Sequence, residues 1–199
     1  MQKLNFIGKD IGNVLKLGST EKVTGGYDII ASGEDIWEKS DAFHFAYTEQ
    51  TGDFDLIAQI ESLSEAHLYT KAGLMAREST EYDSKHVFIL VFPDNSPRNN
   101  NNGGYEFQFR DEKGGSSEAI YPSDFVSLPP KFPVNFPNTW VRLKRNHNEF
   151  TAFYSCDGTH WKEYAKHSLE MNSKLCVGLA LTSHNNNETT VCKFRNISI

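Results

Sequence analysis

Seven side chains with charged or hydrogen-bonding groups alternate with apolar residues in four stretches of this sequence. Successive side chains of a strand point to opposite faces, so polar residues that alternate with a core-facing row face away from that core. The residues concerned are His44, Lys71, Arg77, His86, Glu106, Gln108 and Arg110. If their strands are neighbours, we expect one exposed concave face rich in hydrogen-bond donors, suited to sugars, carboxylates or phosphates.

The alternative is a solvated sheet face on which long basic side chains lie flat across the neighbouring rows. His184, in the stretch "TSHN", either reaches the rim of the face or bonds a backbone carbonyl at a strand end. On the binding hypothesis, Arg110→Ala should weaken an anionic or polyhydroxylated ligand by about 1.5–3 kcal/mol. It should leave thermal stability nearly unchanged, because the residue is expected to face solvent.

The sequence offers no complete set of catalytic residues. Glycoside hydrolysis needs two carboxyl groups that flank the bond, and the stretch with Glu106 continues with Gln108 and Arg110. Acids in "GEDIWE" fall in a turn, and Asp55 and Glu61 are too far apart along one strand to act as a pair. We therefore expect a protein that binds without turnover, with no catalytic residues.

The sequence also predicts neither a cofactor nor a metal site, because no two histidines have the spacing of metal ligands. Asp35 and Asp41 are the alternative, as partial ligands of a calcium ion at the rim of a sandwich. Cys156, Cys176 and Cys192 form no metal-binding pattern, and three free thiols suit a reducing compartment.

Short alternating apolar runs separated by turn residues indicate the fold class. They occupy residues 43–47, 56–60, 72–76, 87–91, 107–109, 141–143, 150–154 and 177–181. Glycine-containing turns separate many of them, and the pair Asp157-Gly158 is a strong hairpin signal. The pattern predicts an all-β antiparallel sandwich that occupies residues 1–199 as a single domain.

Two long loops interrupt this pattern. Residues 93–104 are rich in asparagine and without an apolar anchor, which predicts a mobile hairpin end. Residues 116–138 contain five of the seven prolines together with several aromatic residues, which predicts an ordered cover. That cover is either a lid beside a binding face or a shield for a sheet edge.

Charge and hydropathy limit the classes of partner that we expect. The net charge is −6 and the basic residues are interspersed with acids, so we expect no nucleic-acid partner. No apolar run has the length of a membrane span and none near the start resembles a signal peptide, so we expect a soluble, cytoplasmic protein.

Five segments carry a resemblance to a known family. In order they are "IIASGEDIWEKSDAFHFAY", "KAGLMARE", "YEFQFR", "WVRLKRNHNEFTAFYSCDGTHW" and "CVGLALTSHN". Together they resemble the concanavalin A-like, jelly-roll family of the fungal regulation of enolase protein 1, from end to end of the chain.

The resemblance implies a concanavalin A-like jelly roll in which Trp37 and Trp161 close turns. It also implies a non-catalytic regulatory protein of a fungus, with enolase as its partner. The alternative is a carbohydrate-binding or glycoside hydrolase-like protein that uses the concave face of the sandwich for a polyhydroxylated or anionic small ligand.

Overall fold

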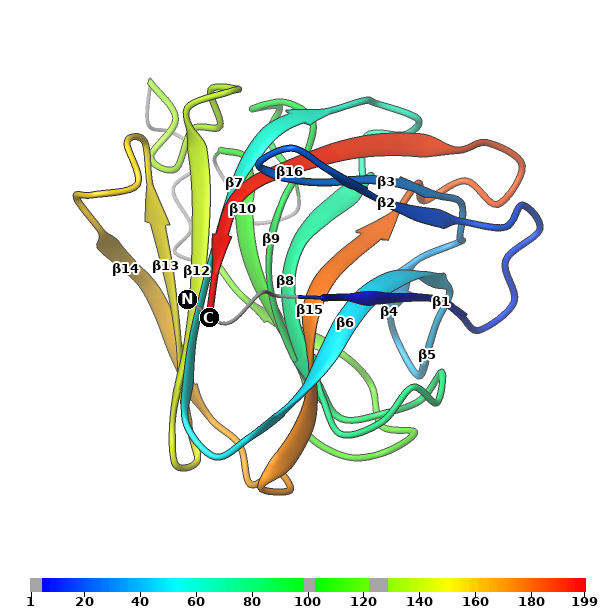
Figure 1. The fold of residues 1–199 in the computed structure, drawn as a ribbon, viewed down its shortest axis with the longest axis vertical. Helices are drawn as coiled ribbons and strands as arrows, with labels where there is room; N and C mark the ends of the chain where they lie inside the picture. Colours follow the sequence, from blue (N-terminus) through cyan, green and yellow to red (C-terminus); the bar gives the residue numbers. More distant parts are fainter. Residues whose placement is uncertain (1–4, 99–102, 122–128) are drawn as a thin grey trace.

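The structure, a computed structural model, describes residues 5–98, 103–121 and 129–199. These residues contain no helix, and two seven-stranded sheets pack face to face with every strand pair antiparallel (Figure 1). The all-β sandwich predicted from alternation is therefore confirmed. No helix in these ranges is long and apolar enough to cross a bilayer.

The two sheets are built from segments that are far apart in the sequence. The first sheet has the order β1 (Ile7–Ile11), β6 (Phe43–Thr51), β15 (Lys174–Thr182), β8 (Lys71–Arg77), β9 (His86–Val91), β10 (Tyr105–Arg110) and β11 (Glu118–Ile120). The second has the order β14 (Lys162–Ser168), β13 (Glu149–Ser155), β12 (Thr139–Asn146), β7 (Phe54–Leu63), β16 (Thr190–Ser198), β3 (Gly26–Ala31) and β2 (Ser19–Val23). Strands β4 (Ile36–Trp37) and β5 (Ser40–Asp41) form a small hairpin that is not hydrogen-bonded into either sheet.

The central core lies between the inner faces of the two sheets. Every second residue of strands β8 and β9 faces this core, as alternation predicts. Leu74 and Ile89 are examples, fully buried and directly opposite each other. Strands β7 and β12 supply the facing layer with residues such as Leu56 and Leu143. One continuous apolar core therefore fixes the register of the strands that carry the polar residues.

The outer face of the first sheet is also apolar over much of its area. Phe45, Met75 and Phe88 belong to a second buried cluster, separate from the central core. The segment 32–42, which we call the cover segment, packs on this face and buries Ile36 in the same cluster. The first sheet is thus buried on both sides, and the expectation of an exposed outer face is wrong over this region.

A glycine allows the two ends of the cover segment to approach each other. Gly33 has φ +128°, and a Cβ added there would lie 2.0 Å from the backbone oxygen of Ala42. Any other residue would clash with this backbone atom as well as adopt an unfavourable φ. The glycine in "SGEDIW" therefore lets the cover segment close on itself. Its contacts with β8, β9 and β10 include those of Asp41.

The described part of the proline-rich loop contributes to sheet and core. Residues 118–120 form β11 and pair with β10 at the edge of the first sheet. Phe132 is buried in the central core, where its ring contacts those of Tyr154 and Tyr164. Both observations fit an edge cover. Residues 122–128 of this loop and 99–102 of the asparagine-rich loop lie outside the described residues.

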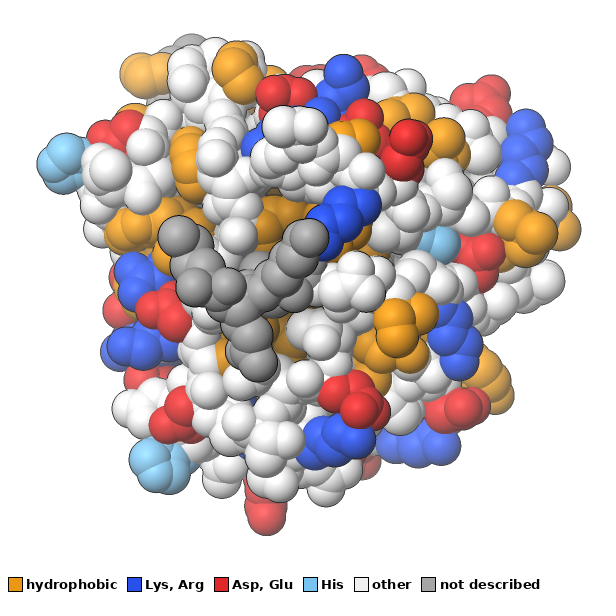
Figure 2. All heavy atoms as spheres, viewed as in Figure 1, with side chains coloured by type: hydrophobic (Ala, Val, Ile, Leu, Met, Phe, Trp, Pro, Cys, Tyr) orange, Lys and Arg blue, Asp and Glu red, His pale blue; other side chains and the backbone are white. Residues whose placement is uncertain are grey.

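The surface shows no segregation of charge on the face seen in Figure 2, where basic and acidic side chains are interspersed. All three cysteines are free thiols: Cys156 is exposed, Cys176 partly buried and Cys192 buried.

Candidate functional site

Four of the predicted ligand-binding residues line one cavity, which we call the deep cavity. It has a volume of about 330 Å³ and lies between the outer face of the first sheet and the cover segment. Strands β8 and β10 and the loop after β15 supply Lys71, Glu106, Gln108 and His184. The remaining described lining residues are Asp35, Trp37, His67, Tyr69 and Tyr121.

Lys71 connects the sheet to the cover segment at this cavity. Its ammonium group donates to the Asp35 carboxylate at 2.6 Å and to the backbone oxygen of Ile36 at 3.2 Å, and it lies 5.5 Å from the centre of a Trp37 ring. Burial raises the pKa of Asp35, but Lys71 and His184 outweigh that effect and lower the pKa to about 2. Asp35 is therefore ionised at neutral pH and Lys71 is already engaged.

Glu106 and Gln108 form the buried end of the cavity. The Gln108 amide nitrogen donates to Oε1 of Glu106. The other two atoms, Glu106 Oε2 and Gln108 Oε1, are buried and have no hydrogen-bond partner among the described residues. Burial raises the pKa of Glu106, and the attraction of Lys71 offsets only part of that effect. Buried polar atoms of this kind normally bond to water or a ligand.

Aromatic and imidazole rings form the opposite wall. His184 adopts a left-handed backbone conformation, φ 55°, and its Nε2 lies 3.1 Å from the Asp35 carboxylate. Its ring stacks on that of His67 with centroids 4.5 Å apart, and the Tyr69 ring lies 5.5 Å away. Burial and the neighbouring His184 lower the pKa of His67. A wall of flat rings beside buried polar atoms is a common form of small-ligand site.

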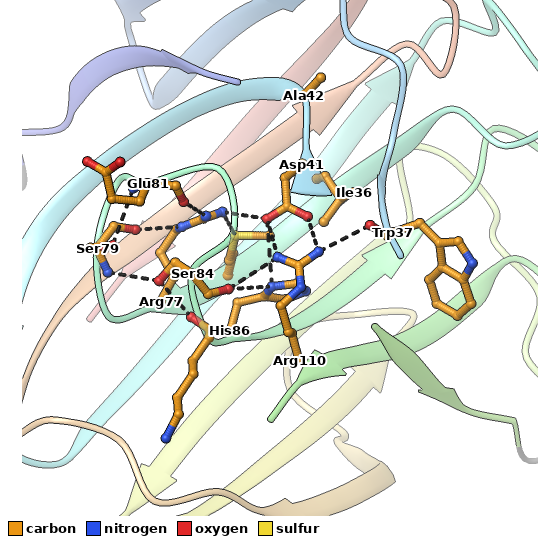
Figure 3. Close-up of polar contacts among 12 residues, drawn as sticks. Ile36, Trp37, Asp41, Ala42, Arg77, Ser79, Glu81, Ser84, His86 and Arg110 are labelled. Carbon is orange, nitrogen blue, oxygen red and sulfur yellow. Dashed lines mark hydrogen bonds and ion pairs between the residues drawn. The ribbon is translucent and has the colours of Figure 1, made fainter. Parts of the chain in front are cut away.

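Three other predicted residues share this face but form a separate, fully buried cluster around Asp41. Arg110 makes a bidentate pair with the Asp41 carboxylate at 2.7 and 2.8 Å, and Arg77 lies 3.2 Å from it (Figure 3). His86 Nδ1 is 3.8 Å from the same carboxylate. Figure 3 also shows the Trp37 indole turned away from this cluster.

This cluster is a structural clamp, because β5 carries Asp41 and the sheet carries its partners. The side chains of Arg77, His86 and Arg110 have no exposed area, so the expectation that they lie on a solvent-facing groove is corrected. The alternation pattern predicts the face of the sheet on which these residues lie, but the cover segment packs over that face. The reason given for an unchanged stability of Arg110→Ala is therefore wrong, and we expect this variant to be destabilised.

His44 lies on the other face of the first sheet. It is directly opposite Leu181, a residue of the central core, and its ring bonds Asp10 at 2.7 Å and Thr20 at 2.8 Å. The sequence pattern assigned Phe43 and Phe45 to the central core, whereas they pack in the second cluster. Placing them on the wrong face moved His44 to the wrong face too.

Sequence reasoning missed the contributions of the cover segment and of the loop before β8. Asp35, Trp37, His67 and Tyr69 line the deep cavity although none lies on the strands that supply its floor. The glycine in "SGEDIW" was a signal for a closed turn, because glycine permits close backbone approach, but it did not show which surface the turn covers. Asp35 and Asp41, the alternative calcium ligands, are both engaged by basic side chains.

A two-sheet antiparallel sandwich of this kind is the architecture of the concanavalin A-like jelly-roll proteins. The chain belongs to the family described as "Protein of unknown function (DUF1349)", which matches residues 28–199. No curated protein matches the sequence. The predicted connection with enolase is carried by the resemblance alone.

Solved structures show the same fold. A functionally unknown protein from Saccharomyces cerevisiae has a TM-score of 0.67 at 16% identity, covering 96% of this chain and 94% of its own. The carbohydrate-binding module CBM66 from Bacillus subtilis has a TM-score of 0.57 at 12% identity, covering 96% and 92%. Lectin I-B4 from Griffonia simplicifolia has a TM-score of 0.55 at 9% identity, covering 98% and 94%.

Proposed function

We propose that this protein binds a polyhydroxylated ligand of the carbohydrate class in the deep cavity and does not transform it. The proposal rests on two buried atoms at the end of that cavity, Glu106 Oε2 and Gln108 Oε1, which have no hydrogen-bond partner among the described residues. A hydroxyl group both donates and accepts, so it can satisfy such atoms in either protonation state of the carboxyl group.

The walls and the fold support the same class of ligand. Trp37, Tyr69 and His184 offer ring faces, on which the apolar faces of sugar rings can pack. The cavity volume of about 330 Å³ is at the lower end of the range for small-molecule sites. Among proteins of this fold are a carbohydrate-binding module and a lectin.

Removing one of the two end groups should weaken the ligand. We expect Gln108→Met to reduce affinity about 10-fold or more, because an apolar side chain of similar size leaves a ligand hydroxyl without its acceptor. Calorimetric titration of purified protein with a panel of mono- and oligosaccharides measures this. Gln50→Met is the matched control, because Gln50 is partly buried on β6 of the same sheet and lines neither this cavity nor the groove described below.

Saccharides that bind the wild type and Gln108→Met with equal affinity would show that the ligand binds outside this cavity. Binding of no saccharide at all, by protein whose melting temperature is normal, would contradict the proposed ligand class.

Glycoside hydrolysis is the second candidate, favoured by one observation. The cover segment brings Asp35 into the same cavity as Glu106, so two carboxyl groups line it after all. Asp35 is held by Lys71 and His184, and its pKa of about 2 makes it a weak base. We expect no sustained release of reducing sugar from oligosaccharides. Turnover that disappears in Glu106→Gln would show that the cavity is an active site.

A cytoplasmic location, which three free thiols suit, is a further proposal, and so is a regulatory contact with enolase, which only the sequence resemblance supports. Mixing purified enolase with this protein in analytical ultracentrifugation tests the contact. A complex at micromolar concentration is the expected result, and independent sedimentation of both proteins would remove enolase as a direct partner.

A further inference from the structure

A second and larger hollow adjoins the deep cavity. This open groove has a volume of about 1010 Å³ and runs past the cover segment, the end of β1 and the turn after β8. Asp35, Trp37 and His184 line both the groove and the deep cavity. The two hollows therefore meet at a shared wall, with the buried end groups Glu106 and Gln108 in the deep cavity only.

The groove has side chains suited to a chain of sugar units. Tyr82 is 53% exposed and lines the groove, and the partly buried Trp37 stands at the junction with the deep cavity. Asn13 and Ser40 add hydrogen-bonding groups on its walls. An exposed ring at a distance from the deep cavity gives a second unit of an extended ligand a surface to pack on.

Charge restricts the ligand further. Glu34, Glu38 and Glu81 line the groove and are exposed, whereas Lys9 is the one lysine or arginine among its described lining residues. The Lys9 ammonium group donates to the Thr80 hydroxyl at 2.7 Å. An acidic chain would therefore meet mostly like charge in the groove, and its binding is disfavoured.

We propose that the two hollows form one site for a non-acidic oligosaccharide, whose terminal unit enters the deep cavity while the following units lie in the groove. This inference rests on the proposed function, since it assumes that the deep cavity accepts a sugar unit. It adds that the site recognises the end of a sugar chain, binds longer chains more tightly and excludes uronic acids.

The test is a titration series in chain length. Neutral oligomers of glucose, mannose, xylose and N-acetylglucosamine, from one to five units, are compared with oligogalacturonates of the same lengths. We expect at least one neutral series to gain 10-fold or more in affinity from one to four units, and the galacturonates to bind at least 10-fold more weakly than neutral oligomers of equal length.

Two variants show whether the gain in affinity with chain length comes from the groove or from the deep cavity. Tyr82→Ala should abolish most of the gain with length and leave the affinity for a single unit unchanged, whereas Gln108→Met should weaken binding at every length. The triple variant Glu34→Gln, Glu38→Gln, Glu81→Gln should reduce the difference in affinity between neutral and acidic oligomers.

Single-unit binding with no gain from longer chains would overturn the extended site and leave the proposed function intact. A gain with length that Tyr82→Ala does not reduce would have the same consequence. Equal affinity for galacturonates would overturn the exclusion of acidic chains, again with the proposed function intact. A failure of every series to bind, single units included, would overturn the proposed function and this inference with it.

Discussion

Asp41→Ala is expected to destabilise the protein by about 3–5 kcal/mol, because the substitution leaves two buried guanidinium groups without their counter-ion. The Asp41 carboxylate binds Arg110 through both oxygens and lies 3.2 Å from Arg77, and none of the three side chains has exposed area. Burial lowers the pKa of Arg77, with Asp41 acting in the opposite direction. Urea denaturation monitored by fluorescence measures the loss.

A surface pair gives the matched control. Asp55 also makes a two-oxygen contact with an arginine, Arg142, but its side chain is 39% exposed. Asp55→Ala should cost less than about 1 kcal/mol. If Asp41→Ala is too unstable to purify, Asp41→Asn serves, because it keeps the shape and removes the charge. A loss below 1 kcal/mol in both Asp41 variants would contradict the clamp.

Acid is expected to destabilise the protein through His86 by about 3 kcal/mol between pH 7 and pH 4. Burial lowers the pKa of His86 to about 3, since Asp41 only partly offsets burial and Arg77 and Arg110 repel a positive ring. The unfolded chain takes up a proton as pH falls through about 6.5, whereas the folded chain cannot until about pH 3. Stability is therefore full above pH 6.5 and falls as the solution is acidified.

His86→Gln should flatten this dependence, because glutamine does not titrate. Denaturation curves of wild type and variant at half-unit steps from pH 7 to pH 4 give the two slopes. His147→Asn is the control, since the His147 side chain is 88% exposed and its contact with Asp53 is long, at 3.9 Å, so it should leave the slope unchanged. Parallel slopes for wild type and His86→Gln would show that His86 is not held neutral in the folded protein.

The sequence predicts the sandwich well because its central core obeys strict alternation. Residues such as Leu74 and Ile89 face that core, and the same phase puts Lys71, Gln108 and Arg110 together on the outer face. Phase along a strand is a local property and can be read from neighbouring residues.

The burial of the outer face could not be predicted in this way. Phe45 and Met75 occupy the same face as the polar residues, so alternation in β6 and β8 does not distinguish the covered face from the core face. The cover segment returns over the sheet through long-range contacts, such as Asp41 with Arg110, that local pattern does not encode. For the same reason Asp35 and Trp37 were not recognised as cavity residues.

A crystal structure of the protein soaked with its tightest-binding saccharide tests whether the deep cavity is the binding site. We expect a sugar ring in the deep cavity, with hydroxyl groups within hydrogen-bond distance of Glu106 Oε2 and Gln108 Oε1 and a ring face against Trp37 or Tyr69. Well-ordered saccharide bound elsewhere, with the deep cavity holding only water, would contradict it.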